Sequence, residues 1–216
     1  MNFEYLLIVL GVILVSMTLH EVMHGFMAYW LGDDTAKHEG RLTLNPVVHI
    51  DPFMTILLPL LLAVLGGPIF GGAKPVPFNP ARLKYDEWGV ALVALAGPLT
   101  NLFIAFLSFG LLVITGSSSV GLSGSNDLFT TVLILALQVN LGFFAFNLIP
   151  LPPLDGSRVL YALAPEFVRR GMERIEQFGI FVVFILVVAA NSFIFQYMQT
   201  VVRFFIDLFA RLFGVA

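Results

Sequence analysis

The chain has 216 residues, of which 58% are hydrophobic and 12% are charged, and its formal net charge is −3. Average soluble domains carry about 25% charged residues, so this composition, with a mean hydropathy of +0.93, excludes an ordinary water-soluble domain. The 11 basic residues are scattered along the chain, which excludes a basic surface for nucleic acid. The absence of cysteine excludes disulfides and thiolate ligands.

Long stretches without charge dominate the sequence. Asp, Glu, Lys and Arg are all absent from residues 5–20, 52–73, 88–126, 128–154 and 177–202. A helix needs about 20 apolar residues to cross the hydrocarbon core of a bilayer. We therefore expect an all-α polytopic membrane protein, in which residues 1–216 form a single domain with about four to six membrane segments.

Four of the apolar stretches are expected to be membrane-spanning helices, over about residues 3–31, 89–115, 128–148 and 175–190. The first of them lacks a basic N-terminal region and carries Glu4, so we expect a retained helix rather than a cleaved signal peptide. These helices are expected to form the core of the bundle.

Three further features lie between or after these helices. Residues 52–70 are apolar but begin with Pro52 and contain Pro59, which favours a re-entrant hairpin, with a tilted full crossing as the alternative. Residues 40–45 alternate in polarity, which predicts a small membrane-associated β element between the first helix and the core. Residues 192–214 carry polar side chains at spacings of three and four, which predicts an amphipathic helix at the membrane interface.

The distribution of basic residues indicates how the chain crosses the membrane. The loops at residues 32–51, 71–87 and 150–175 contain Lys or Arg, whereas the loop at 116–126 contains neither. Because cytoplasmic loops are enriched in these residues, we expect the first three loops to lie in the cytoplasm. The protein is then a multi-pass protein, which we assign to the plasma (inner) membrane.

The first helix contains the sequence His20-Glu21-Val22-Met23-His24. Positions i and i+4 share one face of a helix, so both imidazoles can bind one metal ion, with Glu21 beside them to handle a proton. Polar groups inside an apolar helix are costly in a bilayer, which makes a functional role their default interpretation. At about 1.5 Å per residue, His20 lies about 22 Å beyond Tyr5, near the cytoplasmic side of a core about 30 Å thick.

A catalytic zinc site needs three protein ligands and one open position for water. The other two histidines, His38 and His49, both lie in the first loop. Asp155 follows the helix expected over 128–148 and reaches the same side of the membrane. Taken alone, however, Asp155 fits better as the capping residue of a short helix that starts at Gly156.

Two motifs in this order carry a resemblance to a known family. His20-Glu21-x-x-His24 is followed by Asn147-x-x-Pro150-x-x-x-Leu154-Asp155-Gly156, and segments such as Gly40-Arg-Leu-Thr-Leu-Asn45-Pro46 lie between them. Together they resemble the site-2 protease family of intramembrane zinc metallopeptidases (peptidase family M50), in its compact branch without PDZ or CBS domains. The resemblance covers about residues 8–190.

The resemblance implies an intramembrane zinc endopeptidase, which hydrolyses peptide bonds in the transmembrane segments of membrane-protein substrates in regulated intramembrane proteolysis. It implies one Zn²⁺ per chain, with Asp155 as the third ligand beside His20 and His24. It also implies that Asn147 lines the catalytic centre, while Glu21 would accept and return a proton. A membrane zinc transporter or a non-catalytic scaffold is the alternative.

The strand predicted over residues 40–45 has two possible roles. It could hold an unwound stretch of substrate by β-addition, or it could pair with residues 74–78 as an ordinary surface strand. The sequence favours neither role.

Overall fold

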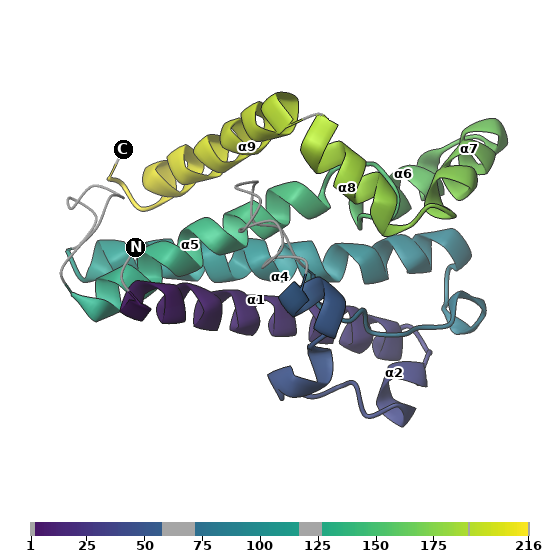
Figure 1. Cartoon of the computed structure of the whole chain (residues 1–216), viewed down its shortest axis with the longest axis horizontal. Helices are drawn as coiled ribbons and strands as arrows, with labels where there is room; N and C mark the ends of the chain where they lie inside the picture. Colours follow the sequence, from purple (N-terminus) through teal and green to yellow (C-terminus); the bar gives the residue numbers. More distant parts are fainter. Residues whose placement is uncertain (1–2, 58–71, 117–126, 190, 216) are drawn as a thin grey trace.

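The computed structural model describes residues 3–57, 72–116, 127–189 and 191–215. Every regular element in these ranges is a helix (Figure 1). The elements in chain order are α1 (Phe3–Trp30), α2 (Thr35–His38), η1 (Pro46–His49), η2 (Pro52–Leu57), η3 (Pro80–Arg82), α4 (Asp86–Ile114), α5 (Leu128–Asn147), α6 (Gly156–Leu163), α7 (Glu166–Glu176), α8 (Ile180–Ala189) and α9 (Asn191–Leu212). The all-α prediction is confirmed.

Four of the described helices are long and apolar enough to cross a membrane, namely α1, α4, α5 and α9. The chain is therefore an integral membrane protein. Helix α5 begins at Leu128 because the side chain of Asp127 accepts a hydrogen bond from the backbone N–H of Thr130, which satisfies one of the free donors of the first turn.

Helix α4 is the centre of the bundle. It packs against α1 and α5, and these three helices run side by side along the long axis of the molecule (Figure 1). Leu137 and Leu141 of α5 are fully buried in a cluster that also contains Phe109 of α4 and Phe209 of α9. Close packing of this kind stabilises a bundle in lipid, where burial from water contributes little between helices.

The region after α1 is tied to the segment that precedes α4. The buried carboxylate of Asp33 accepts hydrogen bonds from the backbone N–H of Thr35 (3.1 Å) and of Asn79 (2.6 Å). The backbone N–H of Lys84 donates to the carbonyl oxygen of Leu31 (2.9 Å). These bonds fix the path of residues 72–84 beside the end of α1.

The β element predicted over residues 40–45 is wrong, since the described residues contain no strand. Arg41 instead links this segment to the chain before α4, because its Nη2 donates to the carbonyl oxygens of Lys74 (2.8 Å) and Pro75 (3.3 Å). Pro75 and Pro77 have no N–H to donate, so that segment lacks the donors for a regular ladder. Both roles considered for a strand fail with it.

The helix predicted over residues 175–190 is also wrong as a single span. Its first two residues end α7, and a separate helix, α8, starts at Ile180. Gly179 between them has a φ of 50°, a left-handed conformation that ends the helical run and that glycine adopts without a steric penalty. Residues 192–214, expected at the interface, lie mainly in α9, which is long and apolar enough to cross.

Two predictions fall largely outside the described residues. The re-entrant or crossing segment at 52–70 is described only over η2, up to Leu57. The external loop at 116–126 is described only at its first residue.

Candidate metal centre

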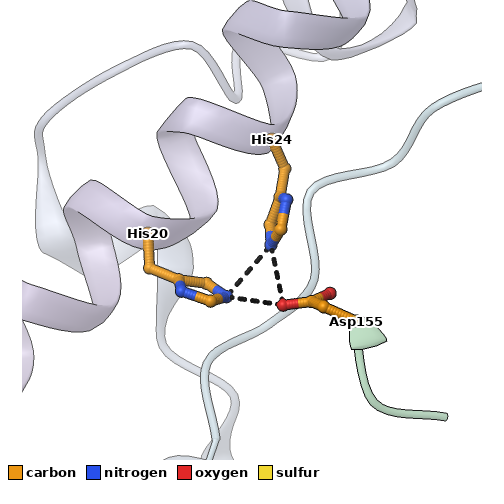
Figure 2. A group of neighbouring side chains, drawn as sticks. All are labelled: His20, His24 and Asp155. Atoms are coloured by element: carbon orange, nitrogen blue, oxygen red, sulfur yellow. Dashed lines mark hydrogen bonds and ion pairs between the residues drawn. The ribbon is translucent and has the colours of Figure 1, made fainter. Parts of the chain in front are cut away.

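Three potential metal ligands converge between α1 and the start of α6 (Figure 2). His20 and His24 lie one turn apart on α1, and their Nε2 atoms are 3.0 Å from each other. Asp155 Oδ2 lies 3.2 Å from Nε2 of His20 and 3.5 Å from Nε2 of His24. The two histidines are 8% and 9% exposed, so the cluster is sheltered within the helices.

A tight turn after α5 brings Asp155 to the histidines. Asp155 occupies the N-cap position of α6, but its side chain makes no capping hydrogen bond among the described residues and points to the imidazoles instead. A Cβ atom on Gly156 would overlap the carbonyl oxygen of Leu148 and come within 2.9 Å of that of Ile149. Glycine therefore permits the close return of the chain. The short helix starts at Gly156 as the capping interpretation expected, but the Asp155 side chain does not make the capping bond among the described residues.

Helix α4 approaches the histidines at a glycine. A Cβ on Gly97 would lie 2.5 Å from His24 Nε2 and 2.7 Å from His20 Cε1. Any larger residue at this position would displace the two rings. Gly97 therefore allows α4 to pack closely on α1.

The orientation of the His24 ring follows from its hydrogen bond. Nδ1 of His24 lies 2.7 Å from the backbone carbonyl oxygen of Val93. A carbonyl oxygen can only accept, so Nδ1 carries the proton, and in the neutral ring Nε2 presents a lone pair to the cluster. Within the described part of the chain, the buried Oδ2 of Asp155 receives no hydrogen bond.

These residues fit a zinc ion by chemistry and by spacing. Lone pairs of two imidazoles and a carboxylate facing one another repel unless a cation lies between them. Zinc bonds of about 2.1 Å in a tetrahedral site place the ligand atoms about 3.4 Å apart. The observed separations of 3.0, 3.2 and 3.5 Å are close to that value.

Glu21 contacts the segment that leads to α4. Its Oε2 accepts a hydrogen bond of 2.9 Å from the backbone N–H of Val76, in the segment that leads to α4. The side chain is half-buried, and Glu21 follows His20 directly in the sequence. One carboxylate oxygen is thus held by the backbone beside the metal cluster.

Asn147, the last residue of α5, is not part of the three-residue cluster. Its Nδ2 donates to the carbonyl oxygen of Phe143 in its own helix (3.0 Å), which uses one of its two amide hydrogens. The other two histidines are occupied elsewhere: His49 Nε2 contacts the carbonyl oxygen of Thr43 (2.9 Å), and His38 pairs with Asp34.

Three contacts of the centre were not anticipated from the sequence. The carbonyl of Val93 and the N–H of Val76 are backbone groups, which leave no signature in the amino-acid type. The third contact is made by Asn101 of α4, whose Oδ1 lies 2.6 Å from His20 Nδ1. The sequence did contain a signal for a functional role of this residue, because an amide inside an apolar helix is costly in a bilayer.

Comparison with known proteins identifies the family. The model of Peptidase family M50 matches residues 117–190. "Putative zinc metalloprotease YwhC" of Bacillus subtilis is 43% identical over 187 residues, which span 84% of this chain and 78% of the relative. The chain belongs to peptidase family M50.

Two further relatives of this M50 protein carry the same description. Rip2 of Mycolicibacterium smegmatis is 34% identical over 189 residues, which span 85% of this chain and 68% of Rip2. MJ0611 of Methanocaldococcus jannaschii is 30% identical over 164 residues, which span 74% of this chain and 73% of the relative. No solved structure gives a significant match.

Family membership settles the class of enzyme and its metal. The chain is a membrane zinc metalloprotease, and the prediction of a site-2 protease family member from the two sequence motifs is confirmed. Zinc is the cofactor, and the described residues offer a possible site for it in His20, His24 and Asp155.

Proposed function

We propose that this M50 protein is an intramembrane endopeptidase, which cleaves peptide bonds within the transmembrane segments of other membrane proteins. The observation that carries this proposal is the convergence of His20, His24 and Asp155. Two of these residues lie inside an apolar helix long enough to span the membrane. A protease centre at that position meets its substrates at membrane depth.

His20, His24 and Asp155 are the proposed zinc ligands, leaving one position open for water. When bound there, zinc supplies Lewis-acid chemistry, lowering the pKa of a water molecule and polarising the substrate carbonyl. The histidines would hold the ion through Nε2, and Asp155 through the oxygen that lies 3.2 and 3.5 Å from those two atoms.

Glu21 is the proposed general base and acid. It accepts a proton from the attacking water and returns it to the amine nitrogen of the leaving fragment. The hydrogen bond from Val76 engages Oε2, which leaves Oε1 as the oxygen that exchanges the proton. The fixed carboxylate lowers the entropic cost of reaching the productive geometry.

Asn147 is proposed to contact the substrate. One amide hydrogen is committed to Phe143 in its own helix, so the orientation of the side chain is fixed and the second hydrogen can be donated. Donation to the oxygen of the scissile carbonyl would stabilise the charge that develops there. The position of Asn147 at the end of α5, eight residues before Asp155, supports this role.

The proposed substrates are transmembrane helices with residues that weaken helical structure near the cut site. A helix pairs its carbonyls internally, so the substrate must unwind before attack, and glycine or proline lowers that cost. The basic loops support an orientation in which the centre opens toward the cytoplasmic face of the membrane, from which water reaches it.

The substitution Glu21→Gln tests the mechanism directly. The variant retains the shape of the side chain and the acceptor for Val76, so we expect it to bind zinc at the wild-type level. It cannot accept the proton, so cleavage of a reconstituted single-span protein with a glycine pair in its membrane segment should be abolished. Glu39→Gln, at an exposed site after α2, is the matched control and should cleave normally. Wild-type cleavage by Glu21→Gln would refute the proposed role.

A further inference from the structure

A chain of buried polar side chains leads away from His20 through three helices. Nδ1 of His20 lies 2.6 Å from Oδ1 of Asn101 on α4. Nδ2 of Asn101 donates to Oδ1 of Asn140 on α5 (2.8 Å). Nδ2 of Asn140 donates to Oγ of Ser16 on α1 (2.9 Å) and to the backbone carbonyl oxygen of Ala136 (2.8 Å). Asn101 and Asn140 are fully buried, and Ser16 is 3% exposed.

We call this chain of side chains, which joins His20, Asn101, Asn140 and Ser16, the relay. The backbone of α5 fixes the direction of every hydrogen bond in it. The carbonyl oxygen of Ala136 can only accept, so the amide nitrogen of Asn140 must face it. The oxygen of Asn140 then faces Asn101, which has to present its own amide nitrogen. The oxygen of Asn101 is consequently directed at His20, whose Nδ1 must carry the proton.

We propose that Asn101 and Asn140 are positioning residues for the metal centre, which hold His20 in its Nδ1–H tautomer and aim the lone pair of Nε2 at zinc. This inference rests on the proposed role of His20 as a zinc ligand. Metal-binding histidines characteristically donate their other ring hydrogen to a fixed acceptor, which sets the tautomer and the orientation of the ring. For His24 the backbone carbonyl of Val93 has this function, and for His20 the amide of Asn101 has it.

A role in helix packing alone does not account for the arrangement. A single hydrogen bond between Asn101 and Asn140 would be enough to join α4 to α5. The relay continues instead to a ring nitrogen on a third helix, at 2.6 Å, and the same ring carries Nε2 3.2 Å from Asp155. The oxygen and the nitrogen of each buried amide both have a hydrogen-bond partner, as a buried network requires.

The tautomer of His20 can be measured without any variant that disturbs the fold. Nitrogen NMR spectra of the full-length protein, labelled at histidine and kept in detergent without metal, distinguish a protonated Nδ1 from a protonated Nε2. The His20 signals are assigned by their loss in His20→Gln. We expect protonation at Nδ1 in the neutral ring. A neutral ring protonated at Nε2 would overturn the proposal, whether or not zinc binds.

Zinc affinity provides the second measurement, by competition with a chelator. Asn101→Leu removes the acceptor and should weaken Zn²⁺ binding about 10- to 100-fold. Asn101→Asp retains an oxygen facing His20 and should bind Zn²⁺ more tightly than Asn101→Leu. Ser108→Ala is the control and should leave affinity unchanged, because this buried site lies two turns along α4 and its hydroxyl donates to the carbonyl oxygen of Ile104 in the same helix.

The two measurements separate this inference from the function on which it rests. If the wild type binds zinc and folded Asn101→Leu binds it equally well, the relay has no positioning role while the zinc site stands. If Asn101→Leu does not fold, Asn140→Leu is used, because it removes the hydrogen-bond partner of Asn101. Unchanged zinc affinity in Asn140→Leu would likewise contradict the positioning role. If the wild type binds no zinc, the proposed function fails, and the tautomer measurement still decides the relay.

Discussion

The backbone N–H of Val76 donates a hydrogen bond of 2.9 Å to the carboxylate of Glu21. Two faces of helix α1 therefore carry the proposed functional residues within one turn. One face presents His20 and His24 to α4 and Asp155, and the other presents Glu21 to the segment that precedes α4. Any change in the path of that segment should alter the proposed proton transfer by Glu21 without disturbing the proposed zinc ligands.

Gly25 allows this segment to lie against α1. A Cβ at Gly25 would come within 2.5 Å of Leu42 Cδ2 and 2.9 Å of Val76 Cγ1. Gly25→Ala should therefore displace Val76 and loosen its hold on Glu21. We expect turnover to fall about tenfold to a hundredfold, since misplacing a catalytic group by about 1 Å costs that much, while zinc content stays at the wild-type level.

The control is Gly11→Ala on the same helix, because the Cβ added there meets nothing within 4 Å. Turnover of a reconstituted membrane substrate and zinc content are measured side by side for both variants. Equal turnover in Gly25→Ala and Gly11→Ala would contradict the positioning of Glu21 by this segment.

Gly97 tests the face of α1 that carries His20 and His24. The added Cβ in Gly97→Ala would overlap both imidazoles, so we expect a loss of zinc affinity of at least about tenfold. Gly110→Ala on the same helix is the comparison, since its Cβ would meet the ring of Phe213, which is remote from the centre. The zinc affinity of both proteins is measured by competition with a chelator. Wild-type affinity in Gly97→Ala would contradict the close approach of α4 to the two imidazoles.

Much of the bundle could be predicted from the sequence because membrane spans obey strong constraints. Long uncharged stretches located the helices that became α4 and α5 to within about three residues, a normal margin for helix ends. The i, i+4 spacing of His20 and His24 likewise placed both rings on one face. The prediction of Asp155 as a metal ligand depended on the family resemblance, because its position alone suggested a helix cap.

The two wrong predictions have different physical causes, a tertiary contact in one case and a local backbone break in the other. Residues 40–45 alternate as a strand would, but Arg41 and the prolines at 75 and 77 replace a backbone ladder with side-chain bonds. The apolar run at 175–190 contains a glycine whose positive φ divides it. Apolar content alone does not reveal such a break.

The N-terminus of α5 provides a test of pH dependence outside the membrane-spanning segments. The backbone N–H of Thr130, followed by its hydroxyl, holds the pKa of the Asp127 carboxyl below its ordinary value. A lowered folded-state pKa means that the ionised cap stabilises the protein above the unfolded pKa of about 3.9 and that this stabilisation is lost as the pH falls through the folded value.

We therefore expect Asp127→Ala to unfold at a lower temperature than the wild type at pH 7, with the difference narrowing as the pH falls below about 3.9. Asp127→Asn keeps an acceptor oxygen but cannot titrate, so its unfolding temperature should lack this contribution to the pH dependence. Thermal unfolding in detergent across the pH range measures both. An identical pH profile for the wild type and Asp127→Asn would contradict the assignment.

The zinc content of purified wild-type protein, compared with that of Asp155→Ala, tests the central claim most directly. We predict a zinc ion bound to each wild-type chain and a large loss in Asp155→Ala, because the carboxylate 3.2 and 3.5 Å from the two imidazoles completes the site. Asp207→Ala, an exposed position on α9, should retain full zinc content. Equal zinc in the wild type and in Asp155→Ala would show that the centre proposed between α1 and α6 does not exist.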